Sequence, residues 1–408
     1  MYHLKKQFIL AAAVSAAIAA PGAAFATNGY FAHGYGTKNK GMAGAGVALA
    51  QDTLAAATNP AGMVYVGQRL DVGAAIFNPN REYSNCPVGP GGCAVGAAES
   101  DSDYFLIPHF GYNWMLGSDK SVGLTVYGNG GMNTNYDENV FGGGDAGVNL
   151  EQLFIAPSYS QKFGNFSLGA DLILAYQKFK AFGLSGFAPF SADQASLTNN
   201  GSDTSIGFGF RIGGMVELGS GWTLGAAYQP EIDMDEFDDY AGLFADQGDF
   251  DIPSTYTLGA AWQVNPKWTL ALDWQAINYE DVPSVSNPID TLFLGNQLGS
   301  DDGPGFGWED INIVKLGAAY QQNEQWIWRF GWNQGDQPIP DDQTFFNILA
   351  PGVMEDHLTF GFTRSFGNDS ELNLAFMHAL ETEVKGDPGL PDIEMNQYEL
   401  ELSWGKRF

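Results

Sequence analysis

Apolar and polar residues alternate with a period of two along much of this 408-residue chain. The clearest example is the segment 398–404, where one face carries Tyr398, Leu400, Leu402 and Trp404. The opposite face holds two glutamates and a serine. This alternation is typical of a β-strand that separates an apolar environment from a polar one. We therefore predict a chain built mainly of strands.

Fourteen segments are predicted as strands, and they are 67–78, 102–113, 119–130, 150–163, 166–178, 205–217, 222–229, 255–264, 267–278, 310–321, 325–334, 356–366, 371–380 and 396–408. Short turns and long loops alternate between them, and aromatic residues lie near both ends of the apolar faces. Both features are typical of outer-membrane barrels, in which an even strand number leaves both termini in the periplasm. We predict an all-β fold, a 14-stranded antiparallel transmembrane β-barrel over residues 67–408.

The N-terminus has the three parts of a secretory signal peptide in order. Two lysines precede the apolar run 8–20, and an A-x-A cleavage motif follows at 24–26. The alternative is a buried N-terminal helix. We predict a signal peptide over 1–26 and a mature chain that begins at Thr27. No later apolar run approaches the ~18 residues that a transmembrane helix needs.

The formal net charge is −29, and loss of the two signal-peptide lysines makes it −31. A chain this acidic lacks the basic surface that a nucleic-acid partner requires. The only cysteines, Cys86 and Cys93, flank a loop rich in glycine and proline, and in an exported chain such a pair predicts a disulfide. A zinc site would need two more ligands nearby. We predict no metal and no cofactor.

Three segments resemble the FadL-type outer-membrane transporters of long-chain fatty acids and aromatic hydrocarbons. They are "GMAGAGVALAQDTLAAATNPAGM" at 41–63, "WIWRFGWNQGDQPIPDD" at 326–342 and "EDHLTFGFTRSF" at 355–366. The resemblance extends over essentially all of 27–408. It implies a barrel plugged by an N-terminal hatch, here residues 27–66. The hatch residues that it singles out are Thr27, Asn28, Asn59, Pro60, Ala61 and Gly62.

The resemblance also implies a capture groove for apolar molecules on two external loops. The first loop, 179–204, offers Phe179, Phe182, Leu184, Phe187 and Phe190, and the second, 230–254, offers Phe237, Tyr240, Leu243, Phe244 and Phe250. The alternative is that these side chains pack on each other and order the loops. Nine acidic residues in the second loop fit no EF-hand spacing. We favour a solvated acidic loop that divalent ions can bridge to lipopolysaccharide phosphates.

Charged residues on the inward faces of the predicted strands are Asp171, Arg211, Asp273, Lys315, Arg329 and Glu399. Most such groups in a barrel lumen pair with one another or with a plug. Arg211, Arg329 and Lys315 are the candidates to meet a fatty-acid carboxylate, the two arginines above all because a guanidinium binds it bidentately.

The third predicted strand contains Gly128, Gly130 and Gly131, and glycine within a strand often marks a bulge or kink. By resemblance, a kink here opens a lateral exit through the barrel wall, and the alternative is an ordinary strand end. A second glycine pattern is "TLGAAYQ" at 223–229, "TLGAAWQ" at 257–263 and "KLGAAYQ" at 315–321. We interpret this repeat as a pattern that three strands share for structural reasons, with small residues inside the barrel and aromatic residues outside.

The sequence thus predicts passive uptake of hydrophobic compounds, most of all long-chain fatty acids, with alkanes or monoaromatic hydrocarbons as the alternative. Rival functions are a general diffusion porin, a surface receptor or adhesin, and a lipase or protease. No H-E-x-x-H or G-x-S-x-G motif is present, so we predict no enzyme. We expect a monomer in the bacterial outer membrane, in contact with lipid and lipopolysaccharide.

Overall fold

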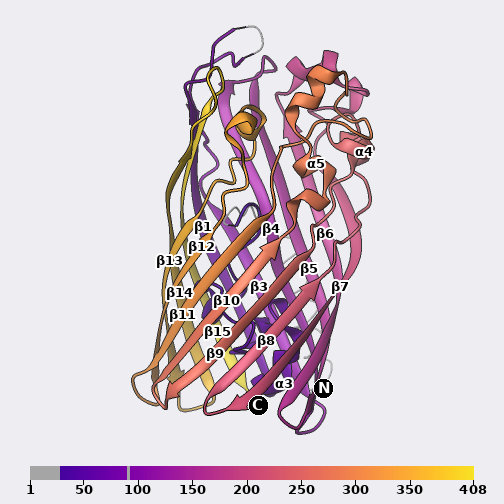
Figure 1. Cartoon of the computed structure of the whole chain (residues 1–408). Coiled ribbons are helices and arrows are strands. Elements are labelled where there is room, and N and C mark those ends of the chain that lie inside the picture. Colours follow the sequence, from indigo (N-terminus) through magenta and orange to yellow (C-terminus); the bar gives the residue numbers. More distant parts are fainter. Residues whose placement is uncertain (1–27, 90–91) are drawn as a thin grey trace.

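The computed structural model describes residues 28–89 and 92–408, whose strands close into an antiparallel barrel (Figure 1). Of the 15 strands in the sheet, all except the two-residue β2 (Ala98–Glu99) form the ring, which β15 closes by pairing with β1. The predicted barrel and its fourteen strands are confirmed. The predicted signal peptide 1–26 and Thr27 lie outside the described residues.

The ring consists of β1 (Arg69–Ser84), β3 (Phe105–Met115), β4 (Lys120–Asn139), β5 (Asp145–Phe163), β6 (Phe166–Phe182), β7 (Asp203–Gly219), β8 (Trp222–Gln229), β9 (Thr255–Asn265), β10 (Trp268–Ile277), β11 (Ile311–Gln321), β12 (Trp326–Gly335), β13 (Asp356–Phe366), β14 (Ser370–Val384) and β15 (Asp392–Arg407). Short helical turns inside it are α2 (Thr37–Lys40), η1 (Thr53–Ala57), η2 (Pro60–Gly62) and α3 (Met63–Val66). Those of the outer loops are η3 (Ser185–Phe190), η4 (Gln194–Ser196), η5 (Asp238–Tyr240), α4 (Ala245–Gly248), η6 (Tyr279–Asp281), α5 (Pro283–Ser286), η7 (Ile289–Leu294), η8 (Asp341–Gln343) and α6 (Thr344–Asn347). Among the described residues, no helix is both long and apolar enough to span a bilayer.

The outer ends of several strands extend further than the alternation predicts. β4 continues to Asn139 and β5 begins at Asp145, so the predicted loop 131–149 is mostly strand. β6 runs to Phe182, which corrects the placement of Phe179 and Phe182 in a loop. Backbone hydrogen bonds between neighbouring strands hold such segments whether or not one face is apolar. Alternation therefore detects only the part of each strand that faces lipid.

Large apolar side chains cover the outside of the barrel. On β10, Leu272 and Trp274 are exposed, whereas Asp273 between them is buried in the lumen. Near the short turns, Trp222 stacks on Trp262 with ring centroids 5.1 Å apart. An apolar outer face with aromatic edges is what a lipid-facing barrel requires.

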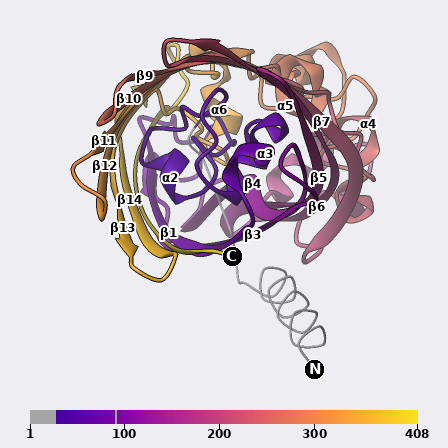
Figure 2. The same ribbon diagram turned by 90° about the horizontal axis from the view of Figure 1, so that it is seen from below.

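Residues 28–66, which we call the hatch, lie inside the ring (Figure 2). Glycines of the wall allow the hatch backbone to approach closely. A Cβ atom on Gly225 or Gly259 would overlap Val47, and one on Gly317 would overlap Met42. These three glycines occupy the same position in the three repeated heptapeptides. The small inward-facing residues of the repeat therefore form the surface on which the hatch packs.

Candidate functional site

The wall of the barrel is incompletely paired at β4. Within the described residues, the ladder between β3 and β4 reaches outward only as far as the pair Phe110–Val126. On the other side of β4, the register with β5 shifts between Gly128 and Gly131. The glycines predicted to kink this strand therefore lie at a bulge, and the β3 side of the strand is open there.

The start of the hatch fills this open edge. The backbone N–H of Ala32 donates to the carbonyl oxygen of Asn129 over 3.1 Å, and the N–H of Gly131 donates to the carbonyl oxygen of Tyr30 over 2.9 Å. Phe31 and Gly130 form the antiparallel bridge between these two bonds. A Cβ atom on Gly130 would overlap the Tyr30 carbonyl. The wall at this point thus includes two backbone groups of the hatch, the N–H of Ala32 and the carbonyl of Tyr30.

Aromatic side chains from the outer loops surround Tyr30, and we call Tyr30, Phe31, Phe250, Tyr279 and Trp308 the aromatic cage. The Tyr30 ring lies 5.2 Å from Phe31, 6.1 Å from Phe250, 5.2 Å from Tyr279 and 5.9 Å from Trp308, measured between centroids. All five side chains are buried. Offset and edge-on aromatic contacts of this kind stabilise by about 1 kcal/mol each beyond the burial of area.

One hydroxyl group fixes the start of the hatch within the cage. The hydroxyl of Tyr279 donates to the carbonyl oxygen of Asn28 over 2.6 Å, and the hydroxyl oxygen of Tyr279 accepts from the N–H of Tyr30 over 3.1 Å. The side-chain amide of Asn28, a predicted hatch residue, is buried without a hydrogen-bond partner. The hatch start therefore depends on Tyr279 for its polar contacts with the loops.

The predicted end of the hatch is pinned to the wall. The side-chain amide of Asn59 donates to the carbonyl oxygens of Val47 and Gly214 over 2.7 and 3.1 Å, and its oxygen accepts from the N–H of Ala61. Pro60 opens η2 (Pro60–Gly62), where its missing N–H is not needed. Ala61 in turn accepts hydrogen bonds from two serine hydroxyls of β5 and β6.

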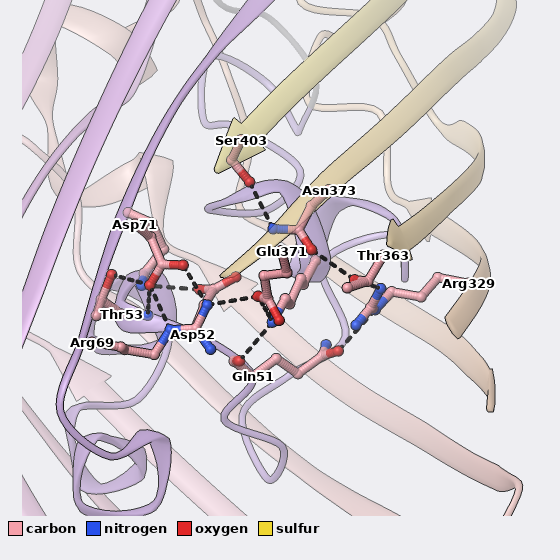
Figure 3. Close-up of polar contacts among 12 residues, drawn as sticks. Gln51, Asp52, Thr53, Arg69, Asp71, Arg329, Thr363, Glu371, Asn373 and Ser403 are labelled. Carbon is pink, nitrogen blue, oxygen red and sulfur yellow. Dashed lines mark hydrogen bonds and ion pairs between the residues drawn. The ribbon is translucent and has the colours of Figure 1, made fainter. Parts of the chain in front are cut away.

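A buried ionic network joins the middle of the hatch to the wall (Figure 3). Arg69 contacts both Asp71 and Glu371, the latter over 2.7 Å. Lys38 of the hatch forms an ion pair with the same Glu371. Thr53 donates to Asp71 through its backbone N–H and its hydroxyl, over 3.0 and 2.8 Å. The hatch is thus connected to the strands β1 and β14 by one continuous set of ion pairs and hydrogen bonds.

The predicted carboxylate candidates all have partners in the hatch or the wall. Arg329 donates to Gln51 of the hatch and to Thr363 of β13 (Figure 3). Lys315 donates to the backbone carbonyl of His33 over 3.0 Å. Arg211 forms an ion pair with Asp171 at 3.3 Å. Buried cations that already have acceptors are less available to a ligand carboxylate.

Two further inward charges bind the hatch itself. Glu399 of β15 pairs with Lys40 of the hatch at 2.8 Å, and Asp273 accepts from the backbone N–H groups of Gly46 and Val47. A cavity of about 30 Å³ adjoins Arg211 and Lys315 between hatch and wall. Its volume is on the scale of about one or two water molecules.

The predicted capture residues are mostly packed inside the loop assembly. Their buried members are Phe179, Leu184, Phe187, Phe237, Tyr240, Leu243, Phe244 and Phe250. Phe179 contacts Tyr240 and Phe244 with centroid distances of 4.8 and 4.7 Å. Phe190 is the one that is clearly exposed, at 49%. In this conformation the residues order the two loops against each other.

A model of the family described as "Outer membrane protein transport protein (OMPP1/FadL/TodX)" matches residues 13–388. The chain belongs to this family. The long-chain fatty acid transport protein of Escherichia coli K12 is 22% identical over an alignment of 423 positions, which covers 90% of each chain. Its counterpart in Salmonella typhi is 23% identical over an alignment of 414 positions, again with 90% of each chain covered.

Solved structures show the same fold as this OMPP1/FadL/TodX member. The toluene transporter TodX of Pseudomonas putida has a TM-score of 0.67 at 19% identity, with 92% of this chain and 99% of that chain covered. A FadL homologue of Pseudomonas aeruginosa reaches 0.69 at 18% identity, with 93% and 100% covered. The chain is thus an outer-membrane β-barrel of a family of transporters, which is not a family of enzymes.

Charge is concentrated in the outer loops of this family member. Partial burial and repulsion from Asp249 raise the pKa of Asp251 to about 7, and desolvation with the charge of Asp251 raises that of Glu231 to about 7. No group of three or more histidine, cysteine or acidic side chains among the described residues is arranged to hold a metal ion. The predicted disulfide between Cys86 and Cys93 is formed.

The sequence predicted Phe250 as a loop residue but did not predict that the five residues of the aromatic cage meet. Tyr30 is the fourth residue of the predicted mature chain, and Tyr279 and Trp308 lie at opposite ends of one long loop. The sequence did contain one indication of the cage. Large aromatic residues, which are usually buried, occur in an external loop that would be expected to be polar. That signal marks an ordered loop but does not say which part of the chain the loop contacts.

Proposed function

We propose that this protein carries out passive uptake of hydrophobic compounds across the outer membrane. The observation that carries the proposal is the docking of residues 30–32 on the open edge of β4, directly beside a fully aromatic cage. The names of the relatives support it, since they are fatty acid and toluene transporters. No nucleotide motif indicates an energy source.

The proposed route begins at the outer loops and ends at the side of the barrel. A compound reaches the aromatic cage, where it replaces contacts that Tyr30 and Phe31 make. An aromatic lining of this kind is typical of ligand pockets, and the compound takes the place of rings that are packed on each other in the structure. Withdrawal of residues 28–32 from β4 then opens the wall at Asn129–Gly131, and the compound leaves into the membrane. Gly128, Gly130 and Gly131 form the proposed exit.

Long-chain fatty acids are the first candidate substrates, because curated relatives carry that name, and alkanes or monoaromatic hydrocarbons are the second. If a carboxylate enters, Arg211, Arg329 or Lys315 must exchange a present partner for it. The capture role of Phe179, Phe182, Leu184, Phe187, Phe190, Leu243 and Phe244 is likewise part of the proposal, and it requires the loops to separate.

The remaining proposals concern assembly. We propose a signal peptide over 1–26, a hatch over 27–66 and a barrel over 67–408. Both termini lie in the periplasm, and the barrel acts as a monomer. Its long loops contact lipopolysaccharide, with divalent ions between their carboxylates and the lipid phosphates.

Deletion of residues 28–35 tests the role of the hatch start. In proteoliposomes, we expect the deletion to change the initial rate of uptake of apolar compounds several-fold, because the edge of β4 is then uncovered. Conductance for small sugars should stay near zero, since residues 36–66 still fill the lumen. Heat-modifiable electrophoretic mobility provides the check that the barrel is assembled. Unchanged uptake of every apolar compound would contradict the proposal, and high sugar conductance of the intact chain would indicate a porin.

A further inference from the structure

Tyr30 occupies the aromatic cage with a ring that carries one hydroxyl group. This ring is fully buried and lies between 5.2 and 6.1 Å from the rings of Phe31, Phe250, Tyr279 and Trp308, measured between centroids. Phe31 follows Tyr30 in the hatch, whereas the other three rings belong to the outer loops. The loops therefore pack around a phenol group that the hatch supplies.

The other polar side-chain groups of the cage already have partners. The hydroxyl of Tyr279 is bound to the backbone of Asn28 and Tyr30. The indole N–H of Trp308 donates to the side-chain oxygen of Asn347 over 2.6 Å. The hydroxyl of Tyr30 differs, because within the part of the chain that the structure describes it makes no hydrogen bond of good geometry. Among the cage residues, the capacity for a further hydrogen bond is therefore concentrated at this hydroxyl.

The side-chain amide of Gln152 meets the Tyr30 hydroxyl from the wall. Gln152 lies on β5 opposite the bulge of β4 and is only 2% exposed. Its side-chain oxygen accepts from the amide of Asn129 over 3.0 Å. A Cβ atom on Gly130 would lie 3.2 Å from the same oxygen and would overlap the Tyr30 carbonyl, so Gln152 adjoins the hatch start. The amide nitrogen of Gln152 acts on the Tyr30 hydroxyl as a donor, yet neither atom completes a well-formed hydrogen bond with any described residue.

This imperfect contact between Tyr30 and Gln152 is unfavourable, because both groups lose their hydrogen bonds to water on burial. Tyr30 cannot shift freely to improve it, since its backbone is bound to Gly131 and to Tyr279. A free phenol has no such tether and can place its oxygen at the hydrogen-bonding distance from the Gln152 amide. The cage and Gln152 together therefore suit an untethered phenol better than the side chain that fills them.

We propose that the aromatic cage and Gln152 form a binding site for small phenols, and that Tyr30 is the intramolecular occupant that a phenol displaces. The proposal rests on the proposed uptake function and narrows its substrate class to hydroxylated monoaromatic compounds. The rings supply apolar contacts, and the amide nitrogen of Gln152 donates to the phenol oxygen. A bare hydrocarbon such as toluene leaves that buried donor without an acceptor, and sites built around a hydroxyl discriminate against analogues that lack it.

The variant Tyr30→Ala opens the position of the ring to a free ligand, and p-cresol is the probe because it has the chemistry of a tyrosine side chain. Isothermal titration of the detergent-solubilised protein compares p-cresol with toluene in Tyr30→Ala and in Tyr30→Ala/Gln152→Leu. Partition of each compound into micelles is common to all variants and cancels in the comparison. We expect Tyr30→Ala to prefer p-cresol, and the double variant to lower this preference about tenfold, as the loss of a buried hydrogen bond implies.

Gln397→Leu is the matched control for Gln152→Leu. Gln397 is also a buried glutamine of the wall, on β15, and its amide contacts the sulfur of Met395. Combined with Tyr30→Ala, it should leave the preference for p-cresol unchanged, and heat-modifiable mobility checks that each barrel is assembled. The proposal is overturned if Tyr30→Ala does not prefer p-cresol, if the preference persists without Gln152, or if the control loses it equally.

A second measurement keeps Tyr30 in place and so does not depend on the folding of Tyr30→Ala. Ala32→Cys supplies a single free thiol, since Cys86 and Cys93 are joined. We expect p-cresol to accelerate labelling of this thiol by a maleimide several-fold, because displacement of Tyr30 uncovers the hatch start. Toluene at the same free concentration should have a smaller effect, and Gln152→Leu should abolish the difference. Equal effects of the two compounds overturn the proposal. Failure of the proposed function is recognised separately, by unchanged uptake after deletion of residues 28–35.

Discussion

The carbonyl oxygen of Tyr30 accepts a hydrogen bond from the backbone N–H of Gly131 at 2.9 Å, and this bond makes the hatch part of the barrel wall. Wall strands normally satisfy their backbone groups with neighbouring strands, since lipid offers none. Here β4 relies on a segment that is not a strand of the ring. Removal of that segment exposes polar backbone groups of β4. A closed wall and an open wall would therefore differ mainly in the position of residues 30–32.

Gly130→Ala should displace the start of the hatch. The added Cβ atom would overlap the Tyr30 carbonyl, and forced overlaps of this kind cost about 1–3 kcal/mol. We expect a cysteine placed at Ala32 to react faster with a water-soluble maleimide in this background. Gly214→Ala is the control, because its Cβ would lie at an ordinary 3.6 Å from Leu168. Equal labelling in both backgrounds would mean that the hatch start tolerates the overlap.

Asn59→Ala should loosen the junction between hatch and barrel. It removes donors to Val47 and Gly214, and a buried carbonyl left without its partner costs about 1–3 kcal/mol. We expect faster proteolysis near 47–62, measured by mass spectrometry of limited digests. Asn59→Asp retains the acceptor for Ala61 and loses only the two donors, so it should cost as much or more, since it adds a buried charge. Digestion rates equal to those of the intact chain would show that Asn59 does not hold the junction.

Glu371→Ala should disrupt the ionic network at the hatch. It leaves Lys38 without its ion-pair partner in a buried site, a change that typically costs about 3–5 kcal/mol. We expect larger and more frequent ion-conducting events in planar bilayers, because the hatch moves away from β14. Glu324→Ala, on an exposed short turn, should have no effect. If bilayers with Glu371→Ala show no additional conducting events, the remaining hydrogen bonds are sufficient to hold the hatch against the wall.

Loop 230–254 should become less stable as the pH rises. The pKa values of Asp251 and Glu231 in the folded loop are about 7, above those of the unfolded chain, which are about 4. The folded loop therefore binds more protons, and its stability falls as the pH rises from about 4 through about 7. Hydrogen exchange of the Ile232 and Ile252 amides, which pair with each other, measures this once intrinsic exchange rates are divided out. The variant Glu231→Gln/Asp251→Asn should remove the pH dependence, and its persistence would point to other carboxylates.

Much of the barrel could be predicted from the sequence, because a lipid-facing strand needs an apolar residue at every second position. The segment 398–404 shows this directly. The outer ends of β4 and β5 were missed, since they pair through backbone bonds and carry no such pattern. The predicted disulfide needed only the spacing of two cysteines and an exported chain.

The candidate site was predicted in parts but not as a whole. Gly130 and the hatch were both identified, yet nothing in either segment says that Tyr30 meets Gly131. The capture residues illustrate the converse. Phe179 and Phe244 were expected at a groove because they are apolar residues in outer segments, and they are buried against each other.

The sequence by itself determined the number of strands, the inward and outward faces and the presence of a small-residue segment before them, because these follow from local periodicity and composition. Only the tertiary structure decided which backbone edge the hatch start covers, which loops enclose Tyr30 and which apolar side chains remain exposed. These depend on contacts between residues as distant as Asn28 and Tyr279. Such contacts arise when closing the ring brings the loops and the hatch together, and no short stretch of sequence contains both partners.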